Sequence, residues 1–281
     1  MPAPRPAPAA GIPPAPRPLA PGPRPPAPDP RPRPAPAAGT PPGPRPLIDV
    51  RGLRFRYEDG TRALNGVDFR LERGETVALL GANGSGKTTF VLHLNGLLAG
   101  EGIVEVCGLP VNPQNIPEIR RKIGLVFQDS ESQLFMPTVL EDVAFGPLNS
   151  GMSREEAVER AQAALQTVGM SAAVAKAPYH LSAGEKKRVA IAGILAMDPE
   201  ILVLDEPTTS LDPPGQRALA ELLVRLPQPK ILATHDVPFA RALCGRAVFF
   251  QGGVIAAEGP VEDIVIRFGW ELALERSKLR R

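Results

Sequence analysis

A glycine-rich segment over residues 81–89 carries residue types at a spacing that suits a polyphosphate. It reads Gly-Ala-Asn-Gly-Ser-Gly-Lys-Thr-Thr and follows an apolar run over residues 76–80. We expect that run to be a buried strand and a helix to begin near Gly86, because backbone N–H groups of such a loop and helix N-terminus form a cradle for phosphate. Lys87 is expected to reach the β- and γ-phosphates, and Thr88 to offer its hydroxyl to Mg²⁺.

Two adjacent carboxylates end a second apolar run farther along the chain. Residues 201–204 are apolar on both faces, as in a buried parallel strand, and Asp205 and Glu206 follow directly. Asp205 can hold Mg²⁺ directly or through water, and Glu206 can polarise an attacking water as a general base. An apolar strand that ends in Asp-Glu is common structure on its own. The phosphate loop upstream is what favours a hydrolytic site here.

The composition of the chain changes sharply near residue 47. Residues 1–46 hold 21 of the 35 prolines and few aliphatic side chains beyond alanine. Such a segment buries too little apolar surface to offset the entropy of ordering, so we predict a disordered tail with polyproline II character. Residues 6–19 match residues 34–47 at 12 of 14 positions, which indicates a duplicated linker and not a solenoid.

The net charge is also divided between these two parts. Residues 1–46 carry six Arg and one Asp, so the +2 of the whole chain leaves −3 for residues 47–281. The part expected to fold therefore lacks the basic footprint of a nucleic-acid-binding protein, and we expect no nucleic-acid partner. The tail is most simply a solvated spacer; contact with anionic lipid or with a proline-reading domain is the alternative.

The sequence favours a cytosolic protein. Cys107 and Cys244 are the only cysteines, and we expect them to be reduced and packed. The first residues lack the apolar core of a signal peptide. No uncharged apolar stretch reaches the ~18–20 residues of a membrane-spanning helix, so work at a membrane would need a separate spanning subunit. The few His and Cys residues do not cluster with metal-ligand spacing.

The order of expected elements is that of an α/β protein with a mostly parallel sheet. Strands are expected over residues 48–57, 66–71, 76–80, 103–106, 123–127, 201–204 and 231–233, with an antiparallel pair over 246–257. Helices are expected from near Gly86 to about Leu98, from Ser153 to about Val168, and after Ala183 and Pro213. Ser153 and Glu156 have the spacing of a helix capping box.

Further short motifs occur in the order found in one protein family. Residues 181–185 read LSAGE, which resembles the signature of ATP-binding-cassette (ABC) ATPases, usually LSGGQ. Gln128 matches the family's Q-loop, Asp212 its D-loop, His235 its switch histidine and Tyr57 the aromatic residue that stacks on adenine. Each match alone is weak, since a lone Gln, His or strand Tyr is usually structural. Together they extend across nearly all of residues 47–281.

The resemblance implies an ATP-hydrolysing cassette over residues 47–281 with ATP and Mg²⁺ as cofactors. The implied fold is a P-loop core with a mostly parallel sheet, an N-terminal antiparallel β subdomain and a helical signature subdomain over about residues 129–197. ATP would be bound by Tyr57, Gly81, Asn83, Gly84, Ser85, Gly86, Lys87, Thr88 and Thr89. Catalysis would involve Glu206, His235, Gln128 and Lys87, and Mg²⁺ would be held by Thr88, Gln128 and Asp205. In a head-to-tail pair, a second cassette's ATP would be contacted by Ser182, Ala183, Gly184, Glu185 and Asp212.

This chain departs from the usual signature at two positions. Ala183 stands for the usual Gly and adds a methyl group, and Glu185 stands for the usual Gln and adds a carboxylate. We expect activity to survive, because Lys186, Lys187 and Arg188 follow and supply compensating cations.

Two segments resemble a narrower group within the family. Residues 126–147 and 181–192 are similar to cassettes of energy-coupling-factor importers, especially those for cobalt and nickel. This implies a motor peripheral to the cytoplasmic face of the cell membrane, with a transmembrane coupling subunit and a substrate-capture membrane subunit as partners. Leu134, Phe135 and Phe145 would form a docking groove for the coupling subunit, or they are core of the helical subdomain. Only 46 residues of this sequence follow His235, so we expect the C-terminal extension of many such cassettes to be short or missing here.

The resulting expectation is the ATP-hydrolysing motor subunit of an importer for cobalt, nickel or a vitamin. The alternatives are an ABC ATPase of another transporter class, a soluble cassette ATPase acting on ribosomes or DNA, and a chain whose proline-rich tail is the functional element. A single cassette without a basic face argues against the soluble class. The cargo, and whether the second cassette is a copy of this chain, stay open.

Overall fold

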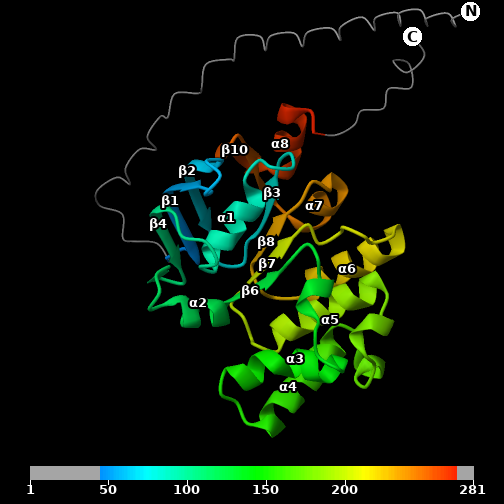
Figure 1. Ribbon diagram of the computed structural model, residues 1–281. Helices are drawn as coiled ribbons and strands as arrows, with labels where there is room; N and C mark the ends of the chain where they lie inside the picture. The colour runs from blue at the N-terminus through cyan, green and yellow to red at the C-terminus, as the bar shows by residue number, and fades with distance from the viewer. Residues whose placement is uncertain (1–44, 271–281) are drawn as a thin grey trace, which may run out of the picture. The chain divides into compact units, whose positions relative to one another are not determined.

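The computed structural model describes residues 45–270 (Figure 1). The predicted tail over residues 1–46 therefore lies almost wholly outside the described residues. The described part contains two sheets with helices packed around them, and none of its helices is long and apolar enough to cross a membrane.

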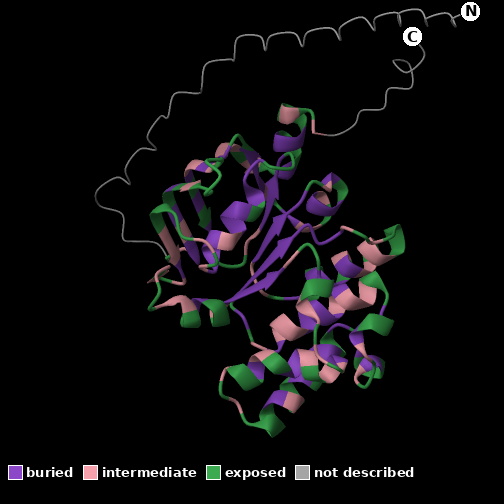
Figure 2. Cartoon of the chain, viewed as in Figure 1, coloured by how far each residue is buried: buried purple, intermediate pink, exposed green. Residues whose placement is uncertain are grey.

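The larger sheet has six strands in the order β10-β9-β3-β8-β7-β6. Its strands are β3 (Thr76–Leu80), β6 (Ile123–Val126), β7 (Ile201–Asp205), β8 (Lys230–Ala233), β9 (Arg246–Gln251) and β10 (Val254–Pro260). All neighbours are parallel except β9 and β10, which confirms the predicted antiparallel pair at the end of the sheet. The central strands are buried along their length (Figure 2), as strands covered on both faces must be.

Strand β8 lies between β3 and β7, and this order creates the site. The three strands are parallel, so their carboxyl ends meet at one edge of the sheet. The phosphate loop follows β3, Glu206 follows β7 and His235 comes two residues after β8. Segments more than a hundred residues apart in the sequence are thereby brought together.

The smaller sheet is antiparallel, in the order β2-β1-β4-β5. Its strands are β1 (Ile48–Arg56), β2 (Arg62–Leu71), β4 (Glu101–Val106) and β5 (Leu109–Pro110). Its inner face shares one apolar core with β3, β8 and α1 (Lys87–Leu94). Within that core the Phe69 and Phe90 rings meet edge to face, and the Phe90 ring packs against Phe250. Strand β1, which ends just before Tyr57, also contacts α1, because the Phe55 ring meets His93 edge to face.

A group of helices between β6 and β7 forms the helical part of the fold. Its members are α3 (Val139–Asn149), α4 (Arg154–Thr167) and α5 (Ala183–Leu195), with three short 3₁₀ turns over Glu131–Gln133, Ser171–Ala173 and Pro178–His180. Each of the three α-helices begins with a capping box, of which the sequence analysis identified the one at Ser153. Buried alanines line the contacts between these helices, so they approach one another closely.

The remaining helices are α2 (Ile116–Lys122), α6 (Pro213–Arg225), α7 (Val237–Leu243) and α8 (Val261–Phe268).

The predicted fold class is confirmed, but several helices and strands begin or end at other residues than expected. The helix expected to run to Leu98 ends at Leu94, because Asn95 is its C-cap and Gly96 takes a positive φ of 67°. The strand expected from Gly66 begins at Arg62, and the one expected to reach Phe127 ends at Val126.

Candidate active site

A pocket of about 360 Å³ opens at the shared edge of β3, β7 and β8. We call it the nucleotide pocket. The predicted site residues that line it are Tyr57, Asn83, Gly84, Gly86, Lys87, Thr88, Thr89, Gln128, Glu206 and His235. Residues Thr61, Arg62 and Ala63 also line it and were not foreseen, because the expected strand began four residues too late to bring them here.

The phosphate loop leaves the start of α1 open. Gly86 is the N-cap at φ 111°, and no side chain caps the helix. A Cβ on Gly86 would meet the carbonyl oxygen of Ala63 at 2.7 Å, so glycine is required both by conformation and by space. The Ser85 hydroxyl oxygen is buried without a hydrogen-bond partner among the described residues. Free N–H groups at a helix start and an unpartnered hydroxyl are donors that a phosphate oxygen can use.

Lys87 lies folded back over this loop. Its Nζ donates to the carbonyl oxygens of Gly81, at 2.7 Å, and Ala82, at 3.2 Å, and lies 3.9 Å from Glu206 Oε1. Its side chain is 5% exposed, and burial lowers the pKa of Lys87, while the Glu206 and Asp205 carboxylates act in the opposite direction. A desolvated ammonium beside the loop is well placed to bind phosphate oxygens.

Glu206 and His235 are in direct contact. Glu206 Oε2 lies 2.8 Å from His235 Nδ1 and 3.4 Å from both the backbone N–H of His235 and the Thr234 hydroxyl. The backbone of Glu206 has φ 44°, a left-handed conformation that costs energy for a residue with a Cβ. Its N–H donates to the Ala233 carbonyl at 2.7 Å, which ties the end of β7 to β8. The fold thus holds the Glu206 carboxylate between Lys87 and His235, on a residue whose backbone is strained.

Asp205 carries a free, buried oxygen. The residue is 3% exposed, and its Oδ1 has no hydrogen-bond partner among residues 45–270. Burial raises the pKa of Asp205 and the neighbouring Glu206 raises it further, whereas a hydrogen bond with Thr88 lowers it. An unpartnered carboxylate oxygen beside the Thr88 hydroxyl, with the amide of Gln128 at the pocket wall, is an oxygen donor set that fits Mg²⁺.

Tyr57 lines the pocket beside Thr89. Its hydroxyl lies 2.9 Å from the Thr89 hydroxyl, and its ring meets Phe55 edge to face with centroids 4.9 Å apart. Phe55 packs in turn against His93, whose Nδ1 lies 2.7 Å from the Thr89 carbonyl oxygen. Tyr57 is 38% exposed, so a held ring presents a free face to a planar base.

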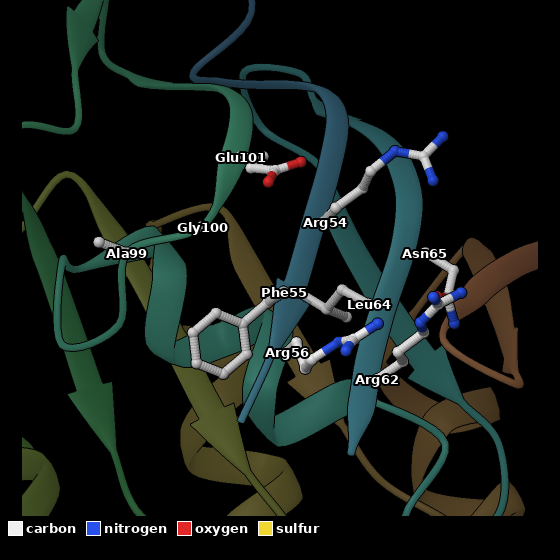
Figure 3. A pocket seen from close by; sticks show the side chains of 9 residues that line it. All are labelled: Arg54, Phe55, Arg56, Arg62, Leu64, Asn65, Ala99, Gly100 and Glu101. Carbon is white, nitrogen blue, oxygen red and sulfur yellow. The ribbon is translucent and has the colours of Figure 1, made fainter. Parts of the chain in front are cut away.

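A second pocket, of about 500 Å³, lies beside the first on the smaller sheet (Figure 3). Figure 3 shows the Arg56 and Arg62 side chains close together on one side of β1, whereas Phe55 points to the other side. Arg56 and Arg62 are cross-strand neighbours. Arg62 lines both pockets, so the two pockets share this side chain.

The signature residues lie outside the nucleotide pocket. Ser182 is the N-cap of α5: its hydroxyl accepts from the Glu185 N–H at 3.3 Å, and the Glu185 carboxylate accepts from the Ser182 N–H at 2.8 Å. Asp212 likewise caps α6 by accepting from the Gly215 N–H at 2.9 Å. These residues do not reach the phosphate loop of their own chain, since none of them lines its pocket.

The interpretation of Lys186 and Lys187 as counter-charges for Glu185 needs correction. Lys186 pairs with Glu131 at 2.6 Å, and Lys187 donates to backbone carbonyl oxygens. The pKa of Glu185 is lowered mainly by its hydrogen bonds with Ser182, with Lys176 and Arg188 assisting. The cap itself, which glutamine would also form, is what accommodates the carboxylate.

Comparison with known proteins identifies the family. The sequence profile of the ABC transporter family matches residues 64–209. An energy-coupling factor transporter ATP-binding protein EcfA from Methanothermobacter thermautotrophicus is 48% identical over 223 residues, covering 77% of this chain and 72% of the relative.

Two solved structures share the fold. The structure of cbiO1 from Clostridium perfringens, part of the ABC transporter complex cbiONQ, superposes with a TM-score of 0.72 at 36% identity and covers 83% of this chain and 97% of that one. A dimeric post-hydrolysis state of the ATP-binding cassette MJ0796, bound to ADP and Pi, has a TM-score of 0.69 at 30% identity and covers 76% and 99%. The present chain therefore belongs to the ABC transporter family and is an ATP hydrolase of that family.

Proposed function

We propose that this chain is the motor subunit of an energy-coupling-factor importer that carries cobalt, nickel or a vitamin. The observation that carries the motor role is the nucleotide pocket, where phosphate loop, carboxylate and histidine converge. The importer class is supported by the names of the relatives, EcfA and cbiO1, and by the motifs around Gln128. The cargo rests on sequence resemblance alone.

In this proposal the pocket binds ATP with its base on Tyr57 and its phosphates at the start of α1. Lys87 turns from the Gly81 carbonyl to the β- and γ-phosphates, and Glu206 accepts a proton from the attacking water. His235, in contact with Glu206, holds that carboxylate in place and reaches the γ-phosphate. Mg²⁺, held by Asp205, Thr88 and Gln128, would neutralise charge as the γ-phosphoryl group leaves.

A second cassette completes the site. Ser182, Gly184 and Asp212 lie outside the pocket of their own chain, and each is part of the start of a helix, where anions bind. We infer a head-to-tail pair in which each signature closes the other chain's ATP. Binding would then bring the cassettes together, and hydrolysis would let them part.

The surface after the Gln128 loop is the proposed contact with the transmembrane coupling subunit. Phe135 is 62% exposed, Phe145 39% and Leu148 42%, and the two phenylalanine rings meet edge to face at 4.9 Å. Asp142 accepts hydrogen bonds from the N–H groups of Phe135 and Met136, which fixes the loop that presents Phe135. Leu134, by contrast, packs against the core. A small exposed apolar surface, formed by Phe135 on this loop and by Phe145 and Leu148 on α3, suits an apolar helix of a partner.

The proposal is tested by identifying the proteins that co-purify with this chain and asking whether they need this surface. The tagged full-length chain is purified from its native membranes in mild detergent, and the proteins that accompany it are identified by mass spectrometry. We expect a transmembrane coupling subunit and a small substrate-capture subunit, lost with Phe135→Ser and Phe145→Ser but kept with Val224→Ser, which removes an exposed apolar side chain on α6. Recovery of the wild type with ribosomal or DNA-bound proteins and no membrane subunit would refute the importer.

A further inference from the structure

Lys187 is a buried cation that contacts the loop carrying Gln128. It lies on α5, five residues after the signature serine, and is 2% exposed. Its Nζ donates to the carbonyl oxygen of Gln128 at 2.9 Å and reaches that of Phe127 at 3.4 Å. We propose that Lys187 is a positioning residue that sets the backbone of Gln128 from the signature helix. The proposal rests on the role of Gln128 in the proposed function.

The contact spans a gap between two parts of the fold. A cavity of about 370 Å³ separates the loop from α5 and is lined by Gln128, Ser130, Lys187 and Thr209, among others. Lys186, the neighbouring residue, also crosses to the loop, but it pairs with Glu131, whose side chain is 67% exposed. Exposed pairs of this kind contribute little.

The use of a lysine here requires a reason beyond filling space. Burial lowers the pKa of Lys187, so its charge is held at a cost that Asp129 and Asp205 nearby only partly offset. A methionine of similar length would fill the same volume without that cost. What the ammonium supplies is hydrogen bonds to two consecutive carbonyl groups, and these fix where the chain leaves β6.

Gln128 links this contact to the chemistry. Gln128 lines both the nucleotide pocket and the cavity beside Lys187. The same segment is also held by Gln133, whose side chain accepts from the Phe127 N–H and donates to the Leu125 carbonyl. Because both Gln133 and Lys187 bond to this segment, a displacement of α5 is passed through Lys187 to the Gln128 backbone. The signature of a chain thus influences that chain's own Mg²⁺ and γ-phosphate contacts.

The test compares Lys187→Met, Lys187→Gln and Lys186→Met in the purified full-length chain. Lys187→Met removes the donor; we expect kcat to fall about tenfold and the Mg²⁺ concentration for half-maximal rate to rise severalfold, with ATP affinity in EDTA changed less than about twofold. Lys187→Gln keeps an N–H donor and should recover much of the loss, and Lys186→Met should resemble wild type. Hydrogen exchange should quicken over residues 127–134 in Lys187→Met and nowhere else.

A double-mutant cycle with Gln128→Ala decides whether Lys187 acts through Gln128. We expect Lys187→Met to add less than about a twofold loss of kcat in the Gln128→Ala background. The proposal would be overturned if the losses of kcat from Lys187→Met and Gln128→Ala multiply in the double variant, or if Lys187→Met alone keeps the wild-type kcat. If Lys187→Met does not fold, the same cycle is measured with Lys187→Gln. Its smaller loss of kcat must then disappear in the Gln128→Ala background. Failure of the proposed function is distinct: it is seen when Gln128→Ala itself hydrolyses ATP normally, or when no membrane subunit is recovered.

Discussion

Two helices of this cassette begin at glycine-containing motifs, and they satisfy their first backbone N–H groups in opposite ways. Helix α1 starts at Gly86, without a side-chain cap and with the Ser85 hydroxyl unpartnered beside it. Helix α5 starts at Ser182 with a complete capping box closed by Glu185. The first end is incomplete until an anion binds, and the second is complete within its own chain.

The difference indicates that the start of α1 binds the phosphates of ATP, whereas the start of α5 contacts a neighbouring cassette. An uncapped helix end in a buried pocket gains most from a ligand, because phosphate oxygens supply the partners that the chain leaves out. A self-capped end is already ordered, so it can present the Ser182 hydroxyl and the Gly184 N–H to a neighbour without first folding. The first end should therefore set affinity for ATP, and the second should set assembly and rate.

The largest effect is expected from Glu206→Gln, which separates ATP binding from ATP hydrolysis at the nucleotide pocket. Loss of the proposed general base should lower kcat at least about a hundredfold. ATP affinity should stay within about threefold, because Lys87 and the phosphate loop are intact. Steady-state phosphate release and equilibrium binding of a fluorescent ATP analogue measure the two quantities. Unchanged turnover would refute the role assigned to Glu206.

The next effect is expected from Lys87→Ala, which removes the cation from the uncapped end. Dissociation constants for ATP should rise about 30- to 100-fold, since a buried charged hydrogen-bonding partner of the phosphates is lost. ATP should also cease to raise the melting temperature at concentrations that stabilise wild type. A variant at the other end, Ser182→Ala, serves as the control and should keep wild-type affinity in the monomer. Normal ATP affinity in Lys87→Ala would contradict the assignment of the loop.

Much of the α1 side could be predicted from the sequence, because its chemistry is local. The loop needs glycines at fixed spacing and an apolar strand before it, and both can be recognised in the amino-acid sequence. The strands that end at Asp205 and before His235 are short apolar runs of the same kind. Their convergence follows from parallel pairing, so the pocket could be foreseen from the order of the motifs.

What could not be predicted depends on contacts between distant residues. Nothing in the sequence indicates that Lys187 reaches the Gln128 carbonyl, or that the Tyr57 hydroxyl meets Thr89. Arg62 reached the pocket only because β2 begins earlier than its apolar pattern suggested. The caps at Thr138 and Ser182, however, had a readable signal, since a glutamate follows each of them three residues later.

A smaller effect is expected from Ser182→Ala, which opens the capped end. Loss of an N-cap hydroxyl should lower the free energy of unfolding by about 1 kcal/mol. For a domain of this size the melting temperature should fall by about 2–4 °C. Hydrolysis should fall as well, but monomeric ATP binding should not. Urea unfolding followed by circular dichroism checks the stability, and an unchanged midpoint would mean that the capping box is not formed in solution.

The smallest effect is expected from Glu185→Gln, which keeps the capping geometry and removes only the charge. The hydrogen bonds with Ser182 lower the pKa of Glu185, so the carboxylate stabilises the fold above its unfolded pKa of about 4.5 and loses that contribution as the pH falls below it. Wild type should therefore be slightly more stable than Glu185→Gln at neutral pH, and the two should converge once the pH has fallen below the lowered pKa that Glu185 has in the folded state. Their urea midpoints, measured across that range, give the difference directly.

The matched control for that difference is Glu159→Gln, in the middle of α4 and away from any helix N-terminus. Its stability difference from wild type should show no such convergence, because a mid-helix carboxylate gains nothing from N-terminal N–H groups. If Glu185→Gln also follows wild type at every pH, the charge at Glu185 contributes nothing to the cap. The departure from the usual signature would then be neutral for folding, and its effect would have to be sought at the partner's phosphates.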